Sequence, residues 1–282
     1  MAVLSTISYA VSDAASKYQA RDYPVERIVC ARYTVPLILL LLFFLPRRGR
    51  SMLRTAHPGL QVLRGLLQQL EPSSIISAYR AMPLAEAQAI SFIHPVLLTV
   101  LAVIFLRERV GSLGWVAVLL GFLGVLLIVR PGGGLFTPIA LLPLGLALSY
   151  SCYQMFTRIV GRRDSSITSL FYVLLVGSLV MSLTLPFVWV DPTPKGLFFF
   201  VLIGVTSGLA HFLTIKSLEY APASLIAPFA YIQLLWISIL GVLVFGDVPS
   251  LYTLAGMAII VASGFLVAAS HRTRRNQVDV RA

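Results

Sequence analysis

Several ionisable side chains of this sequence lie inside long apolar runs. A charge there is costly, so it is expected either to form an ion pair or to take part in function. Asp13, Glu71 and His94 can each take up and release a proton. Arg32 and Arg64 stay charged and can form an ion pair with either carboxylate. For Asp13 and Glu71 we predict either such a structural pair or a part in ion coupling, and for His94 either ion coupling or an interhelical hydrogen bond. The other ionisable residues in these runs are Glu86, His211 and Lys216.

Hydroxyl, amide and aromatic side chains along the same runs form a second set of candidates. A pocket for a small amphiphilic solute is mostly apolar and gains its specificity from a few placed polar groups. The predicted substrate-binding residues are Ser8, Tyr9, Ser12, Tyr79, Gln88, Ser91, His94, Tyr150, Tyr153, Gln154, His211, Tyr231, Gln233 and Trp236. Aromatic residues near the end of a run can instead anchor it at a lipid interface. We assign that role to Tyr18, Tyr23, Trp115, Trp189 and Tyr252.

The sequence has none of the motifs that mark the common enzyme classes. It lacks the nucleotide-binding pattern G-x-x-x-x-G-K-[ST], the zinc-protease pattern H-E-x-x-H and the hydrolase pattern G-x-S-x-G. Its two cysteines, Cys30 and Cys152, lie in apolar runs and can form neither a disulfide framework nor a four-ligand metal site. We therefore predict a protein that is not an enzyme and that has no cofactor and no bound metal.

The composition indicates that lipid surrounds most of this chain. Of its 282 residues, 58% are hydrophobic and 12% are charged, whereas a soluble domain has about 25% charged residues. The net charge of +11 comes from short basic clusters between apolar runs, which argues against nucleic-acid binding. No basic segment precedes the first apolar run, so we expect no cleavable signal peptide. These features predict an integral membrane protein.

Ten segments are long enough to cross a bilayer, because a hydrocarbon core about 30 Å thick needs about 20 helical residues. The predicted spans are 2–18, 25–45, 59–79, 84–106, 112–130, 136–157, 166–190, 195–216, 222–245 and 251–269. The third is the most polar of them. Pro95 and Pro228 lie inside spans, where a proline frees a backbone carbonyl. Such interruptions mark either a central binding site or a kink that aids packing.

The chain contains an internal repeat. Adding 139 to the residue number carries Pro83 onto Pro222 and Glu108 onto Asp247, and the first and sixth spans match at an offset of 141. Five spans per copy is an odd number, so the second copy must enter the membrane from the opposite side. The predicted fold class is all-α integral membrane, with ten transmembrane helices in two inverted five-helix repeats. These repeats cover residues 1–134 and 135–270, and a frayed basic cytoplasmic tail follows at 271–282.

The distribution of basic residues predicts the orientation. If the N-terminus is inside, fourteen Lys and Arg lie on the inner side and six on the outer side. Because positive charge concentrates in cytoplasmic loops, both termini are expected in the cytoplasm. Asp247, in a turn before a helix, is expected to act as a cap or loop pair.

Both halves of the chain resemble a known family. Ala-Met-Pro-Leu-Ala-Glu-Ala at 81–87, Pro95 and the stretch 121–131 resemble the first EamA domain of the drug/metabolite transporter superfamily, and residues 220–264 resemble the second. The resemblance covers nearly the whole chain, and the overall run is similar to the aromatic amino-acid exporter branch, the YddG-like proteins. Asp247 departs from the family pattern, which more often has Glu there.

The resemblance implies a secondary transporter that exports small metabolites across the cell inner membrane by alternating access. Amino acids, aromatic or other neutral, are the expected substrates. The implied partners are a small-molecule substrate and the lipid bilayer, with no nucleic acid, and a monomer is compatible with the sequence. The alternatives are an exporter of drugs or nucleotide-type metabolites, a non-saturable passage, and a membrane protein that does not transport.

Overall fold

The computed structural model describes residues 1–106, 112–129, 138–161, 163–220 and 232–279. Within these ranges all regular elements are helical. The first half of the chain contains α1 (Ala2–Gln19), α2 (Val25–Arg48), α3 (Pro58–Tyr79), α4 (Leu84–Ser91), α5 (His94–Leu106) and α6 (Ser112–Val129). The second half contains α7 (Leu141–Val160), α8 (Ser166–Thr184), α9 (Pro194–Tyr220), α11 (Ile232–Leu240) and α12 (Leu251–Asp279).

Short helical segments directly adjoin four of these helices, α2, α7, α8 and α11. They are η1 (Gly49–Leu53), η2 (Pro138–Ala140), η3 (Leu185–Phe187) and the π-helical η4 (Gly241–Phe245). The predicted spans agree with the observed helices to within a few residues at most of their ends. One difference is the tail, because α12 continues to Asp279 where we expected frayed chain. The start of the predicted span 222–245 and Pro228 lie outside the described residues.

The predicted span 84–106 is not one helix but two. α4 ends at Ser91, and α5 begins at His94 after a two-residue break. A proline at position 95 has no amide hydrogen to donate to the carbonyl of Ser91, four residues earlier. That carbonyl instead lies 3.2 Å from the ring Nδ1 of His94. Pro95 therefore stands at the start of the second helix, where its missing amide hydrogen costs nothing.

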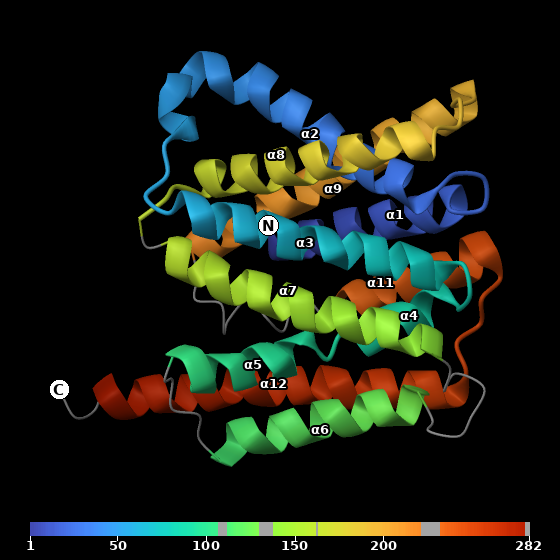
Figure 1. Ribbon diagram of the computed structural model, residues 1–282. Helices are drawn as coiled ribbons and strands as arrows, with labels where there is room; N and C mark the ends of the chain where they lie inside the picture. Colours follow the sequence, from blue (N-terminus) through green and yellow to red (C-terminus); the bar gives the residue numbers. More distant parts are fainter. Residues whose placement is uncertain (107–111, 130–137, 162, 221–231, 280–282) are drawn as a thin grey trace.

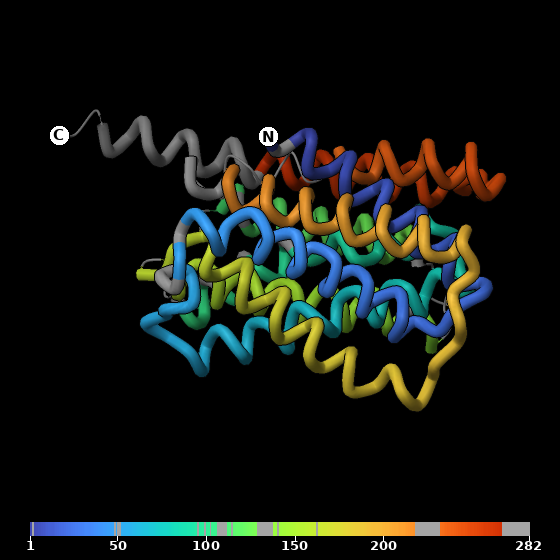
Figure 2. Tube along the Cα trace, turned by 90° about the horizontal axis from the view of Figure 1, so that it is seen from above, coloured from blue at the N-terminus to red at the C-terminus, as the bar shows by residue number. Residues whose placement is uncertain are grey.

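The helices run along one common direction and form a bundle (Figures 1 and 2). In Figure 1, α2 and α8 form the upper edge and α6 and α12 the lower edge, with the other helices between them. The turns at 20–24, 80–83, 185–193 and 246–250 lie at the right, and we call this the Tyr23 end. The turns at 49–57 and 163–165 lie at the left, which we call the Asp164 end.

The distribution of polar and apolar side chains is that of a protein in lipid. Four helical stretches are apolar and long enough to cross a membrane, 25–47, 84–105, 166–187 and 194–217, and shorter apolar helices cover 115–128, 232–245 and 251–266. Large apolar side chains such as Leu183 and Phe187 are 74% and 88% exposed. By contrast, the arginines Arg32 and Arg64 are 1% and 0% exposed. Charge inside and hydrocarbon outside is the arrangement that a bilayer favours.

Small residues allow the helices to approach closely. A Cβ added at Gly124 of α6 would lie 2.9 Å from the carbonyl oxygen of Gly256 on α12. A Cβ at Gly204 of α9 would lie 2.8 Å from the carbonyl oxygen of Ala31 on α2. Helix association in membranes depends on such contacts, because lipid provides no hydrophobic drive between apolar helices.

The N-terminal end of α3 is held by a carboxylate from the turn between α7 and α8. Asp164 accepts hydrogen bonds from the backbone N of Ala56 at 2.8 Å, from Nε2 of Gln61 at 2.9 Å and from the hydroxyl of Thr55. Burial raises the pKa of Asp164, but these hydrogen bonds favour the ionised form and bring the pKa below its usual value. The contact fixes α3, the most polar of the predicted spans, against α7 and α8.

We expect Asp164 to stabilise the fold only while it is ionised. Because its pKa in the folded protein lies below the unfolded value of about 3.9, the stabilisation is complete above that value and is lost as the pH falls through the folded-state pKa. Asp164→Asn should therefore unfold at a lower temperature than the wild type at neutral pH, and the difference should shrink as the pH falls below about 4. Thermal unfolding of the detergent-solubilised protein measures both, and a difference independent of pH contradicts this role.

Candidate functional site

A buried ion pair joins α1 to α2 inside the bundle. Arg32 donates from NH1 to Oδ1 of Asp13 at 2.9 Å, and the two side chains are 1% and 3% exposed. Removing two charges from water costs several kcal/mol for each ion, which their attraction and further hydrogen bonds must offset. Of the partners considered for Asp13, the structure selects Arg32 and not Arg64.

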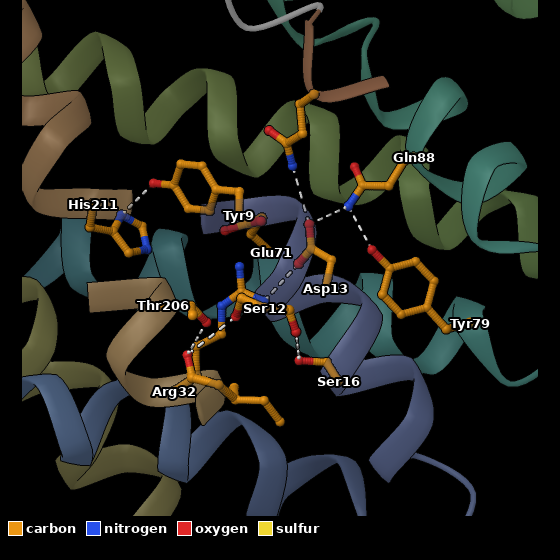
Figure 3. Close-up of polar contacts among 12 residues, drawn as sticks. Tyr9, Ser12, Asp13, Ser16, Arg32, Glu71, Tyr79, Gln88, Thr206 and His211 are labelled. Atoms are coloured by element: carbon orange, nitrogen blue, oxygen red, sulfur yellow. Dashed lines mark hydrogen bonds and ion pairs between the residues drawn. The ribbon is translucent and has the colours of Figure 1, made fainter. Parts of the chain in front are cut away.

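Two glutamines and a tyrosine complete the surroundings of Asp13 (Figure 3). Gln88 of α4 donates from Nε2 to Oδ2 of Asp13 at 3.0 Å and to the hydroxyl oxygen of Tyr79 at 2.6 Å. Gln233 of α11 donates to the same carboxylate oxygen at 3.2 Å. One carboxylate therefore connects α1, α2, α4 and α11 directly, and α3 through Tyr79. Four residues predicted from the sequence meet here.

A second polar group lies one turn earlier on α1. Tyr9 and His211 of α9 share a hydrogen bond of 2.9 Å between the hydroxyl and Nδ1, and their rings meet edge to face at 5.2 Å. Glu71 of α3 lies beside Tyr9 in Figure 3 and accepts a hydrogen bond of 2.5 Å from Gln68. The group thus adds a second carboxylate next to the buried ion pair.

Aromatic side chains form a row between α5 and α7. The ring of His94 meets Tyr150 edge to face at 4.9 Å, and Tyr150 stacks with Tyr153 at 5.7 Å. The backbone carbonyl of His94 accepts a hydrogen bond of 2.8 Å from the hydroxyl of Ser151. We predicted an interhelical hydrogen bond for the His94 side chain, but Nδ1 of its ring bonds locally to the carbonyl of Ser91. The row offers π faces to a ligand.

The remaining predicted residues are not joined to these groups by side-chain hydrogen bonds. Ser8 and Ser91 donate to carbonyls of their own helices, and Ser12 donates to the carbonyl of Ile203 on α9 at 3.3 Å. Gln154 is half-buried on α7 and takes part in none of the contacts above. The last two predicted residues are Trp236 and Tyr231. Trp236 is half-buried on α11, and Tyr231 lies outside the described residues.

The prediction singled out Arg64 and Glu71 on α3 but missed Gln61 and Gln68 as members of the same polar face. Gln61, Arg64, Gln68 and Glu71 recur at spacings of three or four residues, so they lie on one side of the helix. Gln61, Arg64 and Gln68 are fully buried. The sequence held this signal, because a polar stripe at helical spacing within an apolar segment points inward, away from lipid.

An ion pair lies between the Asp13 site and the Tyr23 end of the bundle. Lys17, near the end of α1, forms an ion pair with Asp247, which also lies 3.5 Å from the first backbone N of α4 at Leu84. The ammonium of Lys17 stands 4.7 Å from the ring centroid of Phe245. Asp247 therefore acts as the loop pair expected of it. The contact ties the chain end of α1 to the turn that precedes α12.

The site combines charges of both signs with aromatic faces and spare hydrogen-bond donors. Among the described residues, NH2 of Arg32 and Nε1 of Trp236 are buried without an acceptor. Buried donors normally have a partner, so these two can receive a polar group of a ligand. Within the same part of the chain, no three His, Cys, Asp or Glu side chains gather as metal ligands do. The arrangement suits the binding of a small charged molecule without covalent chemistry.

Comparisons with known proteins match nearly the whole chain to a transporter family. The EamA-like transporter family matches residues 1–130 and 137–269. A solved crystal structure superposes with a TM-score of 0.71 over 97% of this chain and 96% of the other, at 21% sequence identity, which supports the fold alone.

The relatives found by sequence are named as carriers of several metabolites. An S-adenosylmethionine uptake transporter of Rickettsia bellii is 28% identical over 96% of this chain and 92% of its own. A riboflavin transporter of Vibrio cholerae is 28% identical over 91% and 88%. A pseudopaline exporter of Pseudomonas aeruginosa is 26% identical over 93% of each chain. These names support small-metabolite transport and do not favour the aromatic amino-acid exporter branch.

We expect Asp13 and Arg32 to depend on each other for stability. Asp13→Asn and Arg32→Gln should each lower the free energy of unfolding by about 3 to 5 kcal/mol, because each leaves a buried charge unpaired. The double variant should be more stable than the sum of the single losses predicts, by about 1 to 3 kcal/mol. A double-mutant cycle by denaturant unfolding of the purified protein measures this coupling. Additive losses contradict a paired buried charge.

Proposed function

Because this chain belongs to the EamA-like transporter family, we propose that it is a secondary carrier that moves a small charged metabolite through the Asp13 site by alternating access. Membership of the family makes it a multi-pass membrane protein and a transporter rather than an enzyme. The observation that carries the proposal is the buried Asp13–Arg32 pair with its hydrogen bonds from α4 and α11. Intramembrane ionisable groups of this kind mark substrate and ion pathways.

The proposal includes two inverted five-helix repeats that move against each other. The helix contacts between the halves support it, because they occur in matching pairs. α1 packs on α9 as α7 packs on α3, and α1 packs on α11 as α7 packs on α5. The pairs α2 with α8 and α6 with α12 each join equivalent helices. Matching contacts of this kind are expected of two copies related by a pseudo-twofold axis.

In a cytoplasmic membrane, we place the Asp164 end inside the cell and the Tyr23 end outside. The excess of Lys and Arg in the turns and tail of the Asp164 end supports this orientation. With this orientation, the Lys17–Asp247 pair lies on the outer side of the Asp13 site.

The proposed substrate class is a small metabolite with at least one ionised group and a planar ring. Asp13 and Glu71 suit a cationic group, and the aromatic row of His94, Tyr150 and Tyr153 suits a ring. An aromatic amino acid has this chemistry, and so does the S-adenosylmethionine named for one relative. The relatives' names include both uptake and export.

We expect saturable flux of one such compound in proteoliposomes. Purified protein is reconstituted with radiolabelled tyrosine, S-adenosylmethionine or riboflavin on either side of the membrane, with and without a pH gradient. Tyr9→Phe removes the hydrogen bond to His211 and should lower the flux roughly tenfold, within the range expected for losing one polar contact to a charged or buried partner.

The matched control for this variant is Tyr172→Phe. Tyr172 also makes one hydrogen bond of 2.9 Å, to the carbonyl of Leu53 near the Asp164 end. Its flux should stay at the wild-type rate. Flux that rises linearly with concentration would indicate a passage instead of a carrier, and no flux of any compound from folded protein would contradict the proposal.

The ion pair of Lys17 with Asp247 should hold the outer side closed. Asp247→Asn removes the charge that faces Lys17, so a conformation open at the Tyr23 end should become more populated. The readout is alkylation of Ala85→Cys, a position 1% exposed at the start of α4, by a membrane-impermeant maleimide in a background without Cys30 and Cys152. Faster alkylation in Asp247→Asn supports a gate, and an unchanged rate contradicts it.

A further inference from the structure

Arg64 of α3 is a buried cation without an ion pair. Its side chain is 0% exposed, and the ion pairs found among the described residues involve Arg32 and Lys17 instead. NH2 of Arg64 donates to the carbonyl of Ser169 at 2.7 Å, but Nε and NH1 have no acceptor there. A buried charge with neither counter-ion nor full hydrogen bonding is strongly unfavourable, so its retention needs a reason.

Neighbouring protein groups do not remove this cost. Tyr153 of α7 lies under the guanidinium, with the ring centroid 5.3 Å from its central carbon, and contributes a cation–π contact. The side-chain oxygens of Gln61 and Gln68, on the same face of α3, are buried and also lack partners. Pairing either amide with Arg64 would satisfy hydrogen bonds but would leave the positive charge unneutralised. Asp164, the carboxylate at the start of α3, already accepts three hydrogen bonds and forms no ion pair with Arg64 among the described residues.

Arg64 lies on α3 between the Asp13 site and the Asp164 end. Glu71 follows it by seven residues on the same helix face, a rise of about 10 Å along the helix axis. The guanidinium of Arg64 lies over the ring of Tyr153, so it adjoins the row of Tyr150 and Tyr153 described above.

The two equivalent contacts between the halves differ at this position. With the offsets of the repeat, Ser12 corresponds to Tyr153 and Ile203 to Arg64. Where α1 packs on α9, Ser12 donates to the backbone of Ile203 and this contact buries no charge. Where α7 packs on α3, Tyr153 faces the buried Arg64. A requirement of the fold alone would apply to both contacts, so the asymmetry points to a ligand.

We propose that Arg64 binds the carboxylate of the transported metabolite on the cytoplasmic side of the Asp13 site. The donor pairs of a guanidinium that match a carboxylate are NH1 with NH2 and Nε with NH2, so each pair contains one of the two Arg64 donors that have no acceptor. The ring of Tyr153 lies against the guanidinium of Arg64 and helps to hold it in place. This subsite rests on the proposed carrier function for its purpose, but the anion binding itself is measurable without transport.

The first experiment measures the thermal unfolding of detergent-purified protein as sodium acetate increases, with sodium chloride as a comparison. The wild-type midpoint should rise saturably with acetate, by about 3 °C at tenfold the dissociation constant. Arg64→Met should lose this rise. It should also be at least as stable as the wild type without acetate, because it removes an uncompensated buried charge. The control Arg47→Met removes an exposed charge at the same end and should respond as the wild type does.

Three outcomes overturn the proposal. Equal acetate responses in the wild type and Arg64→Met show that the anion acts elsewhere. Saturation by chloride but not by acetate shows a halide site and not a carboxylate site. A large loss of stability in Arg64→Met without any anion shows that Arg64 serves the fold through Ser169.

A second measurement connects the subsite to the substrate. Binding of tyrosine and tyramine, and of S-adenosylmethionine and its decarboxylated form, is compared in the wild type and in Arg64→Met. In whichever of these two pairs binds to the protein, Arg64→Met should weaken binding of the compound with the carboxylate roughly tenfold or more. Binding of the compound without the carboxylate should not change. An acetate response without flux of any tested compound would support the anion site and contradict the carrier function. The experiments can therefore overturn either proposal without overturning the other.

Discussion

The buried ion pair between Asp13 and Arg32 is the interaction on which the arrangement of the inner helices depends. In a bilayer, a charge inside the protein cannot be hydrated, so each ion must find its partner within the bundle. Asp13 does so with Arg32, and its second oxygen accepts from Gln88 and Gln233. Because these donors come from α2, α4 and α11, one carboxylate sets the relative positions of helices that belong to both halves of the chain.

Because lipid surrounds the bundle, the polar face of α3 must also point inward. Gln61 is held by Asp164 at one end of the helix, and Tyr79 is held by Gln88 at the other. Between them lies Arg64, whose charge is not balanced by the described residues. Under the proposed carrier function, binding of a substrate carboxylate would complete the surroundings of Arg64 and so favour the loaded state.

The break between α4 and α5 links backbone chemistry to the site. A proline at position 95 removes one backbone donor, and the freed carbonyl of Ser91 meets the ring of His94. That same turn brings His94 against Tyr150, and its own carbonyl receives Ser151 of α7. The break between α4 and α5 thereby places His94 in the aromatic row with Tyr150 and Tyr153. In a membrane, such irregular backbone is tolerated where it faces protein or a wet cavity.

By itself, the sequence determined that the chain is helical, membrane-embedded and a member of the EamA-like family, because apolar runs of span length and the turns between them are local patterns. It also identified Asp13, Gln88 and Gln233 as candidates, since polar groups in apolar runs are rare and costly. Only the tertiary structure decided that these three meet at one carboxylate, that Arg32 and not Arg64 is its partner, and that the ring of His94 bonds locally. Pairing between helices depends on their rotation and packing, which residues up to 220 positions apart settle together and which no local pattern encodes.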